Sequence, residues 1–274
     1  MRTERGVRSI GLNTNALASS IVLVCRPRPK DAGVASRRDF LAALKRELPE
    51  ALRNLQKGNI APVDLAQAAI GPGMAVFSRY SKVLESDGSA LPVRTALGLI
   101  NRTLDDVLAE QEGEFEPDTR WALAWFDQHG FAEGPYGTAE VLCTAKATSM
   151  KGMEEAGILV SKGGKVRLLH KEELLADWDP ATDDRFTTWE GTHNLCRALE
   201  AGGVEKAAQL VARLGSARAE TARDLAYRLY SVCERRKWAQ DAITYNNLVI
   251  AWPEITQAGG KLAETGPTQQ GLGL

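Results

Sequence analysis

Apolar side chains recur at every third or fourth position over most of the chain, and this spacing predicts amphipathic helices. The first helical segment begins after Ser36, whose side chain can cap a helix, and ends near Gly58. A second helix is expected over 62–70 and a third over 74–84, because Gly71-Pro72-Gly73 should break the chain between them.

One run differs from this pattern because it is continuously apolar. Ala18-Ser19-Ser20-Ile21-Val22-Leu23-Val24-Cys25-Arg26 is rich in β-branched residues and precedes prolines, which is typical of a strand buried on both faces of a sheet. No comparable strand precedes it, and few follow. The sequence therefore resembles, at its start, the last strand of a sheet whose other strands are missing.

The pattern changes again over 117–169. Pro117 starts a helix that Gly130 ends, and two shorter helical segments are expected within 138–156. Apolar runs on either side of Lys162-Gly163-Gly164 predict a β-hairpin. Helix, helix, short helix and hairpin is the order of elements in a winged helix-turn-helix.

These patterns predict a mainly α-helical protein with one N-terminal strand and a small winged-helix-like module that carries a β-hairpin. The expected regions are a terminal strand region (1–30), a helical region (31–115), the winged-helix-like module (116–178), a C-terminal helical region (179–258) and a flexible tail (259–274).

The composition is that of an average globular protein, with 44% hydrophobic and 25% charged residues. Because 34 Lys and Arg face 35 Asp and Glu, the chain is not strongly basic, although a local basic patch stays compatible with this balance. The longest compact apolar run, 21–25, is too short for a membrane span or a secretion signal. The cysteines Cys25, Cys143, Cys196 and Cys233 are expected to be reduced, buried thiols of a cytoplasmic protein.

Familiar catalytic motifs are absent from the sequence. It contains no GxGxxG after a strand, no GxxxxGK[ST], no HExxH and no GxSxG. The Asn/Asp-Pro-Pro-aromatic tetrapeptide of amino-group DNA methyltransferases is also missing. His170 and His193 have no partner at metal-ligand spacing, so we expect both to be structural or surface residues. No catalytic, cofactor-binding or metal-binding residue is assigned.

The first candidate for function is the segment around Gly71 and Gly73. A break there would expose backbone amides at the start of a helix, where a phosphate can bind. Asp64 and Gln67 are the polar residues best placed beside it. The alternative is a tight turn between closely packed helices.

The second candidate is a basic edge of the winged-helix-like module. The residues of this edge could contact DNA phosphates. They are Lys146, Lys151, Lys162, Lys165 and Arg167. Glu154 and Glu155 would repel a DNA backbone, so a protein-interaction or spacer module is the alternative. A basic and aromatic segment over 223–238 is interpreted as a core helix with a charged outer face.

Several runs of the sequence resemble one protein family. They include Ala18 to Arg28, Asp64 to Met74, Val76 to Ser81, Val93 to Leu97, Asp118 to Arg120, Gly164 to Leu169 and Arg223 to Glu234. Together they resemble the C-terminal part of the large adenine-specific DNA methylases that contain a zinc ribbon and a conserved N-terminal domain of unknown function. The resemblance spans roughly residues 10–255.

This resemblance implies an S-adenosylmethionine-dependent enzyme that methylates the exocyclic amine of adenine, some members being encoded in anti-phage operons. It also implies that the run over 18–26 is a terminal strand of the methyltransferase sheet. The family's cofactor-binding glycine motif, catalytic tetrapeptide and zinc cysteines have no matching positions here, so S-adenosylmethionine is expected only for a complete enzyme.

We therefore expect an accessory or target-recognition portion of such a methylase. Its expected partners are DNA, a catalytic methylase subunit or other defence-system proteins, and not a membrane. The alternative is a helical protein-interaction scaffold of an anti-phage defence system with no catalytic role.

Overall fold

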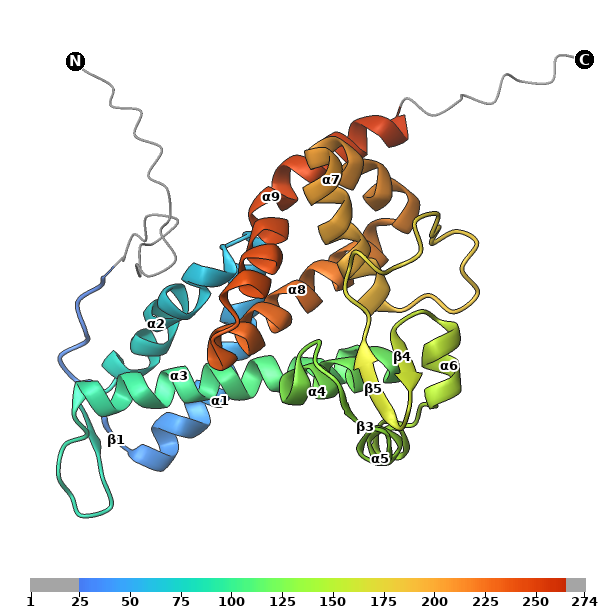
Figure 1. Ribbon diagram of the computed structural model, residues 1–274. Coiled ribbons are helices and arrows are strands. Elements are labelled where there is room, and N and C mark those ends of the chain that lie inside the picture. The colour runs from blue at the N-terminus through green and yellow to red at the C-terminus, as the bar shows by residue number, and fades with distance from the viewer. Residues whose placement is uncertain (1–24, 265–274) are drawn as a thin grey trace, which may run out of the picture.

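The computed structural model describes residues 25–264 (Figure 1). Over these residues the chain is mainly α-helical, as the apolar periodicity predicts. An N-terminal helical layer, a winged-helix-like module and a C-terminal helical bundle follow one another along the chain. The expected strand over 18–26 lies outside the described residues apart from Cys25 and Arg26, which have no regular secondary structure.

The N-terminal layer consists of helices and one pair of short strands. Its elements are β1 (Val34–Ser36), α1 (Arg37–Lys57), α2 (Pro62–Ser78), β2 (Lys82–Leu84), α3 (Val93–Glu110) and the short 3-10 helix η1 (Gln111–Glu114). Helix α1 begins as predicted, because the Ser36 hydroxyl accepts a hydrogen bond from the Asp39 amide and the Asp39 carboxylate accepts one from the Ser36 amide. β1 and β2 pair in parallel and are two strands that were not predicted from the sequence.

Helix α2 continues through Gly71-Pro72-Gly73, so the predicted break between two helices was wrong. Gly73 is buried against α3, and a Cβ atom at this position would lie 2.5 Å from Ile100 Cγ2. This close approach requires a glycine. Because α2 packs against both α1 and α3, tertiary contacts hold the helix together where its intrinsic propensity is poor.

The winged-helix-like module has the predicted order of elements. It contains α4 (Pro117–His129), β3 (Gly134–Pro135), α5 (Tyr136–Lys146), α6 (Met150–Glu155), β4 (Leu159–Lys162) and β5 (Lys165–Leu168). The β4–β5 hairpin is confirmed, and β3 pairs with β5 to give the antiparallel order β3-β5-β4. Figure 1 shows the hairpin beside α6, with the helical bundle above it.

The C-terminal bundle consists of α7 (Thr188–Leu214), α8 (Ser216–Arg236) and α9 (Ala239–Glu264). Gly202 and Gly203 have non-helical dihedral angles and kink α7, and Gly215 separates α7 from α8. Helix α9 runs past the expected start of the tail to Glu264, and 265–274 lie outside the described residues.

Aromatic and polar contacts join the three parts of the fold. Phe126 of α4 lies edge-on to Trp189, Trp238 and Tyr245 of the bundle. The Tyr227 hydroxyl of α8 donates a hydrogen bond to the Ile60 carbonyl at 2.7 Å. The bundle therefore contacts both the winged-helix-like module and the N-terminal layer.

Three of the cysteines are buried as expected, namely Cys143, Cys196 and Cys233. Cys25 is exposed, so the expectation of burial was wrong for this residue. Burial raises the pKa of Cys143 to about 11, which keeps its thiol protonated. Over residues 25–264, each helix is too short or too polar to cross a bilayer.

Candidate functional site

The β4–β5 hairpin, here called the wing, carries three of the predicted cations on its outer face. In the antiparallel register Lys162 pairs with Lys165, and Arg167 lies two residues further along the same face. Gly163 and Gly164 form the tip with φ angles of 59° and 76°, which favour glycine. The inner face of the wing is buried through Leu159, Val166 and Leu168.

Two of these three cations already bind a carboxylate. Lys165 Nζ lies 2.9 Å from Glu133 Oε2, and both Nη atoms of Arg167 lie 2.7 Å from the Glu173 carboxylate oxygens. The hydrogen bond to Glu133 raises the pKa of Lys165, and the hydrogen bond from Arg167 lowers the pKa of Glu173 to about 2. Among the described residues, Lys162 has no ion-pair partner.

The helices beside the wing present fewer positive charges to DNA than the wing does. Lys151 of α6 forms an ion pair with Glu155 at 3.5 Å, and Glu154 accepts a hydrogen bond from the Ser161 amide at 3.2 Å. Lys146 lies half-buried in the last turn of α5. Helix α6 occupies the position of the recognition helix in a winged helix, and its exposed side chains are mostly acidic.

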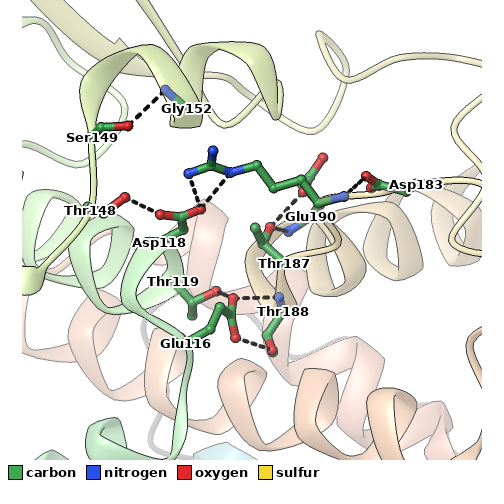
Figure 2. Close-up of polar contacts among 11 residues, drawn as sticks. Glu116, Asp118, Thr119, Thr148, Ser149, Gly152, Asp183, Thr187, Thr188 and Glu190 are labelled. Atoms are coloured by element: carbon green, nitrogen blue, oxygen red, sulfur yellow. Dashed lines mark hydrogen bonds and ion pairs between the residues drawn. The ribbon is translucent and has the colours of Figure 1, made fainter.

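A partly buried polar cluster, here called the polar junction, joins the module to the start of α7 (Figure 2). Asp118 of α4 accepts hydrogen bonds from Arg185 Nε at 3.1 Å, from Arg185 Nη2 at 3.0 Å and from the Thr148 hydroxyl. The Arg185 guanidinium occupies the space that a side chain on Gly152 of α6 would need. Arg185 therefore ties the segment before α7 to both α4 and α6.

The first turn of α7 is held by two glutamates. Glu116 accepts hydrogen bonds from the Thr188 amide at 2.7 Å, from the Thr188 hydroxyl at 2.9 Å and from the Thr119 hydroxyl. Thr187 caps the helix, because its hydroxyl accepts from the Glu190 amide at 3.2 Å and donates to the Glu190 carboxyl at 2.7 Å. Figure 2 shows Glu116 and Glu190 on opposite sides of this turn.

Glu190 is the most perturbed acid of the polar junction. Its residue surface is 5% exposed, and burial raises its pKa from 4.5 to about 8, with smaller contributions from the Asp183 and Asp118 charges. Asp118 and Glu116 use both of their carboxylate oxygens on protein donors. The polar junction therefore has a structural role and holds α4 against the start of α7. Within residues 25–264, no group of three or more His, Cys, Asp or Glu side chains is arranged to hold a metal ion.

His193 is a structural core residue, as the sequence analysis expected. Its Nδ1 lies 2.8 Å from the Trp189 carbonyl and its Nε2 lies 3.0 Å from the Tyr245 hydroxyl. Because a carbonyl can only accept, Nδ1 carries the proton and Nε2 accepts from Tyr245. Burial lowers the pKa of His193 to about 4. His170 is exposed and stacks on Phe131.

The segment around Gly71 is a helix rather than a functional loop. Gly71 and Gly73 lie inside α2, so their amides do not form a helix start. Asp64 is fully buried and Gln67 is exposed. Burial and then the charges of Glu234 and Asp64 raise the pKa of Tyr230, so Asp64 lies near α8. The expected tight turn is therefore absent as well, and only the close packing of this alternative is present, at Gly73 against Ile100.

The core-helix part of the interpretation of 223–238 is confirmed, because α8 buries Leu225, Leu229 and Val232. The expected charged outer face was partly wrong, because Arg223 and Arg228 are buried too. The polar junction was not predicted from the sequence. Thr187-Thr188-Trp189-Glu190 fits the capping pattern and could have marked the start of α7. Nothing local connects Arg185 with Asp118, which is 67 residues away in the sequence.

Residues 116–272 match a protein family described as a domain of unknown function, DUF8807. The match covers more than half of the chain, so the chain belongs to this family. The matched region begins one residue before α4 and includes the wing and the polar junction. Comparisons with curated proteins and with solved structures found no match.

Proposed function

We propose that this chain is a non-catalytic accessory portion of an S-adenosylmethionine-dependent adenine-specific DNA methylase, and that its wing contacts the DNA backbone. The observation that carries the proposal is the outer face of the wing, where Lys162, Lys165 and Arg167 lie together. Cations on a narrow hairpin with a glycine tip can reach phosphates without reading bases. The resemblance to the C-terminal part of these methylases supplies the enzyme class.

This chain would contribute binding and positioning rather than methyl transfer. Its sequence contains neither a glycine-rich cofactor loop nor the tetrapeptide that holds a flipped adenine, so the catalytic part would supply both. We expect calorimetry with S-adenosylmethionine to show no binding by this chain alone. Micromolar binding together with methyl transfer to adenine would contradict the proposal.

The ion pairs of the wing determine the strength of binding that we expect. A phosphate must displace Glu133 from Lys165 and Glu173 from Arg167, and both exchanges cost affinity. Binding to phosphates releases counterions, so the affinity is sensitive to salt. We therefore expect weak binding that depends on salt and is independent of DNA sequence.

The first experiment is a gel-shift titration of duplex DNA at low salt. The triple variant Lys162→Ala/Lys165→Ala/Arg167→Ala should bind more weakly than the wild type on every duplex. Its log-log salt slope should fall by about 0.9 for each phosphate that the variant no longer binds. The control Arg38→Ala/Lys45→Ala/Lys82→Ala removes three positive charges from exposed positions on α1 and β2 and should bind as the wild type does. Equal retardation by both variants would assign the wing to structure alone.

A second variant tests the wing in the opposite direction. Glu133→Gln/Glu173→Gln removes the two carboxylates that occupy Lys165 and Arg167. If the wing contacts DNA, this variant should bind more tightly than the wild type, and adding the triple wing substitution should abolish the increase in affinity. An increase that survives the triple substitution would place DNA binding elsewhere on the chain.

The second candidate is a protein-interaction scaffold of an anti-phage defence system. The observation that favours it is the acidic surface of α6, together with the ion pairs of Lys165 and Arg167. A pull-down with and without nuclease separates the two functions. Protein partners that persist after nuclease treatment and bind the triple wing variant equally well support the scaffold, whereas partners that disappear with the DNA support the methylase portion.

A further inference from the structure

The N-terminal layer and α8 enclose a pocket of about 300 Å³, which shares no lining residue with the wing. One wall is formed by the last turns of α1 together with η1, and the other is one face of α8. Arg53 and Lys57 come from α1, whereas Arg223 and Arg228 come from α8. We call this site the arginine pocket.

The arginine pocket has an excess of positive charge. Its lining includes the cations Arg53, Lys57, Arg223 and Arg228, and the carboxyl groups of Glu114, Glu220 and Asp224. Burial raises the pKa of Asp224, and the neighbouring Arg223 opposes this shift. A ligand that enters between these groups is favoured if it is an anion.

Arg223 is the buried centre of the pocket. Its side chain is 9% exposed, and its guanidinium lies 5.8 Å from the centre of the Trp252 ring. Nε and Nη2 donate to Asp224 Oδ1 at 3.3 Å and 3.0 Å, and Nη1 donates to Asn59 Oδ1 at 3.3 Å. These bonds use three of the five N–H groups of a guanidinium, which leaves one on each Nη atom without a partner among the described residues.

Two glutamines beside Arg223 are also weakly bound. The amides of Gln56 and Gln111 donate to each other over 3.5 Å and 3.3 Å, which is long for hydrogen bonds. Gln56 is 4% exposed. An oxyanion in the pocket can accept hydrogen bonds from these two amide groups in place of the long ones that they now donate to each other.

We propose that the arginine pocket binds a small oxyanion, a phosphate or carboxylate group, between Arg223 and the Arg53–Lys57 edge of α1. The planar guanidinium of Arg223 presents its two remaining N–H groups, a geometry that fits two oxygens of one anionic group. Lys57 supplies positive charge at the opening, and Arg53, whose Nη2 lies 3.8 Å from Glu114 Oε1, would exchange this exposed carboxylate for the ligand. This proposal is independent of DNA binding by the wing.

The test is calorimetric titration of the full chain with inorganic phosphate and, in a separate arm, with acetate. Chloride at matched ionic strength controls for salt. We expect saturable binding with a dissociation constant on the order of 1 mM to at least one oxyanion. Binding of phosphate alone, of acetate alone or of both supports the proposal and identifies the preferred anionic group.

The variants are chosen so that a loss of binding can be distinguished from a loss of folding. Arg53→Ala/Lys57→Ala removes exposed charges from the pocket edge and should weaken oxyanion binding about tenfold. Arg38→Ala/Lys45→Ala removes the same charges from the other end of α1 and should leave the affinity unchanged. Arg223→Lys keeps the buried charge without the planar fork and should abolish binding while circular dichroism stays that of the wild type.

Three results would overturn the proposal. The first is a wild-type protein that shows no saturable heat with either oxyanion. The second is a heat that chloride reproduces. The third is an equal loss of affinity in the pocket-edge variant and in its α1 control. If Arg223→Lys fails to fold, the comparison between the two double variants still decides the outcome.

Discussion

The guanidinium of Arg185 lies directly against Gly152 of α6, in the space that a Cβ atom would occupy. Asp118 holds this guanidinium with two hydrogen bonds, at 3.1 Å from Nε and 3.0 Å from Nη2. A Cβ atom at position 152 would meet the Nη atoms and Cζ of this guanidinium, so the guanidinium would have to shift. The glycine at position 152 therefore leaves the space in which Arg185 reaches Asp118.

We expect Gly152→Ala to destabilise the protein, because the new methyl group displaces Arg185 from Asp118. Losing charge-assisted hydrogen bonds should lower the free energy of unfolding by about 1–3 kcal/mol, partly offset by the better helix propensity of alanine. Urea unfolding of both proteins measures the difference.

Arg185→Ala provides the control for this prediction. Without the guanidinium, Gly152→Ala should be neutral or should stabilise the protein by up to about 1 kcal/mol. If the substitution costs the same free energy in both backgrounds, Arg185 is not the reason that position 152 holds a glycine.

Glu190 should make the protein less stable as the pH rises. Its pKa is about 8 in the folded protein and 4.5 in a solvated side chain, so the folded state holds the proton more tightly. The stabilisation is fully present below about pH 4.5 and is lost as the pH rises through 8, with a total change of about 5 kcal/mol. Glu190→Gln stays neutral and should lack this dependence. Urea unfolding from about pH 5 to pH 9 tests it, and parallel curves for the two proteins would refute the buried, protonated carboxyl.

His193 should make the protein less stable as the pH falls, which is opposite to the effect of Glu190. Burial holds its pKa at about 4, against 6.5 for a solvated imidazole, so the unfolded state takes up the proton first. Stability is present above about pH 6.5 and is lost as the pH falls toward 4, by about 3 kcal/mol. His193→Gln should be less stable than the wild type near neutrality, and the two curves should converge in acid.

Tyr245→Phe is the matched variant for His193. It removes the hydroxyl that donates to Nε2 but leaves the imidazole buried. We expect a cost of about 1–2 kcal/mol with the pH dependence retained. Loss of the pH dependence in Tyr245→Phe would show that the hydroxyl, rather than burial, controls the pKa of His193.

Gly73→Ala should destabilise the packing of α2 against α3 by about 1–3 kcal/mol, because its Cβ would lie 2.5 Å from Ile100 Cγ2. In an Ile100→Ala background the new methyl group has room, so Gly73→Ala should be neutral or stabilising there. Gly98→Ala is the control, since nothing lies within 4 Å of a Cβ atom there, and it should stabilise α3 slightly. Thermal unfolding of the single and double variants measures the coupling.

Local backbone chemistry made part of this fold predictable. Pro117 and Gly130 mark the ends of α4, and the positive φ angles of Gly163 and Gly164 form the tip of the wing where the sequence placed it. These residues act through their own dihedral angles, so the surrounding fold matters little. The alternation of residues in the hairpin also places Lys165 and Arg167 on one face.

Long-range contacts determine what the sequence did not reveal. Gly71-Pro72-Gly73 has every mark of a break, yet packing of α2 between its neighbours outweighs its poor helix propensity. The carboxylate on Lys165 comes from Glu133, 32 residues earlier, and no spacing rule connects them. The strands β1 and β2 have three residues each, which is too short for an apolar alternation to show.

The hydrogen bond from Tyr227 to Ile60 spans 167 residues of sequence, and this separation sets a delay during synthesis. A ribosome that adds about 5–20 residues per second completes α8 about 10–30 s after Ile60. Helices α1, α2 and α3 contact one another and can assemble during this interval, while the surface that meets α8 stays uncovered. The arginine pocket needs both of its walls, so a nascent chain acquires it only after α8 has left the ribosome.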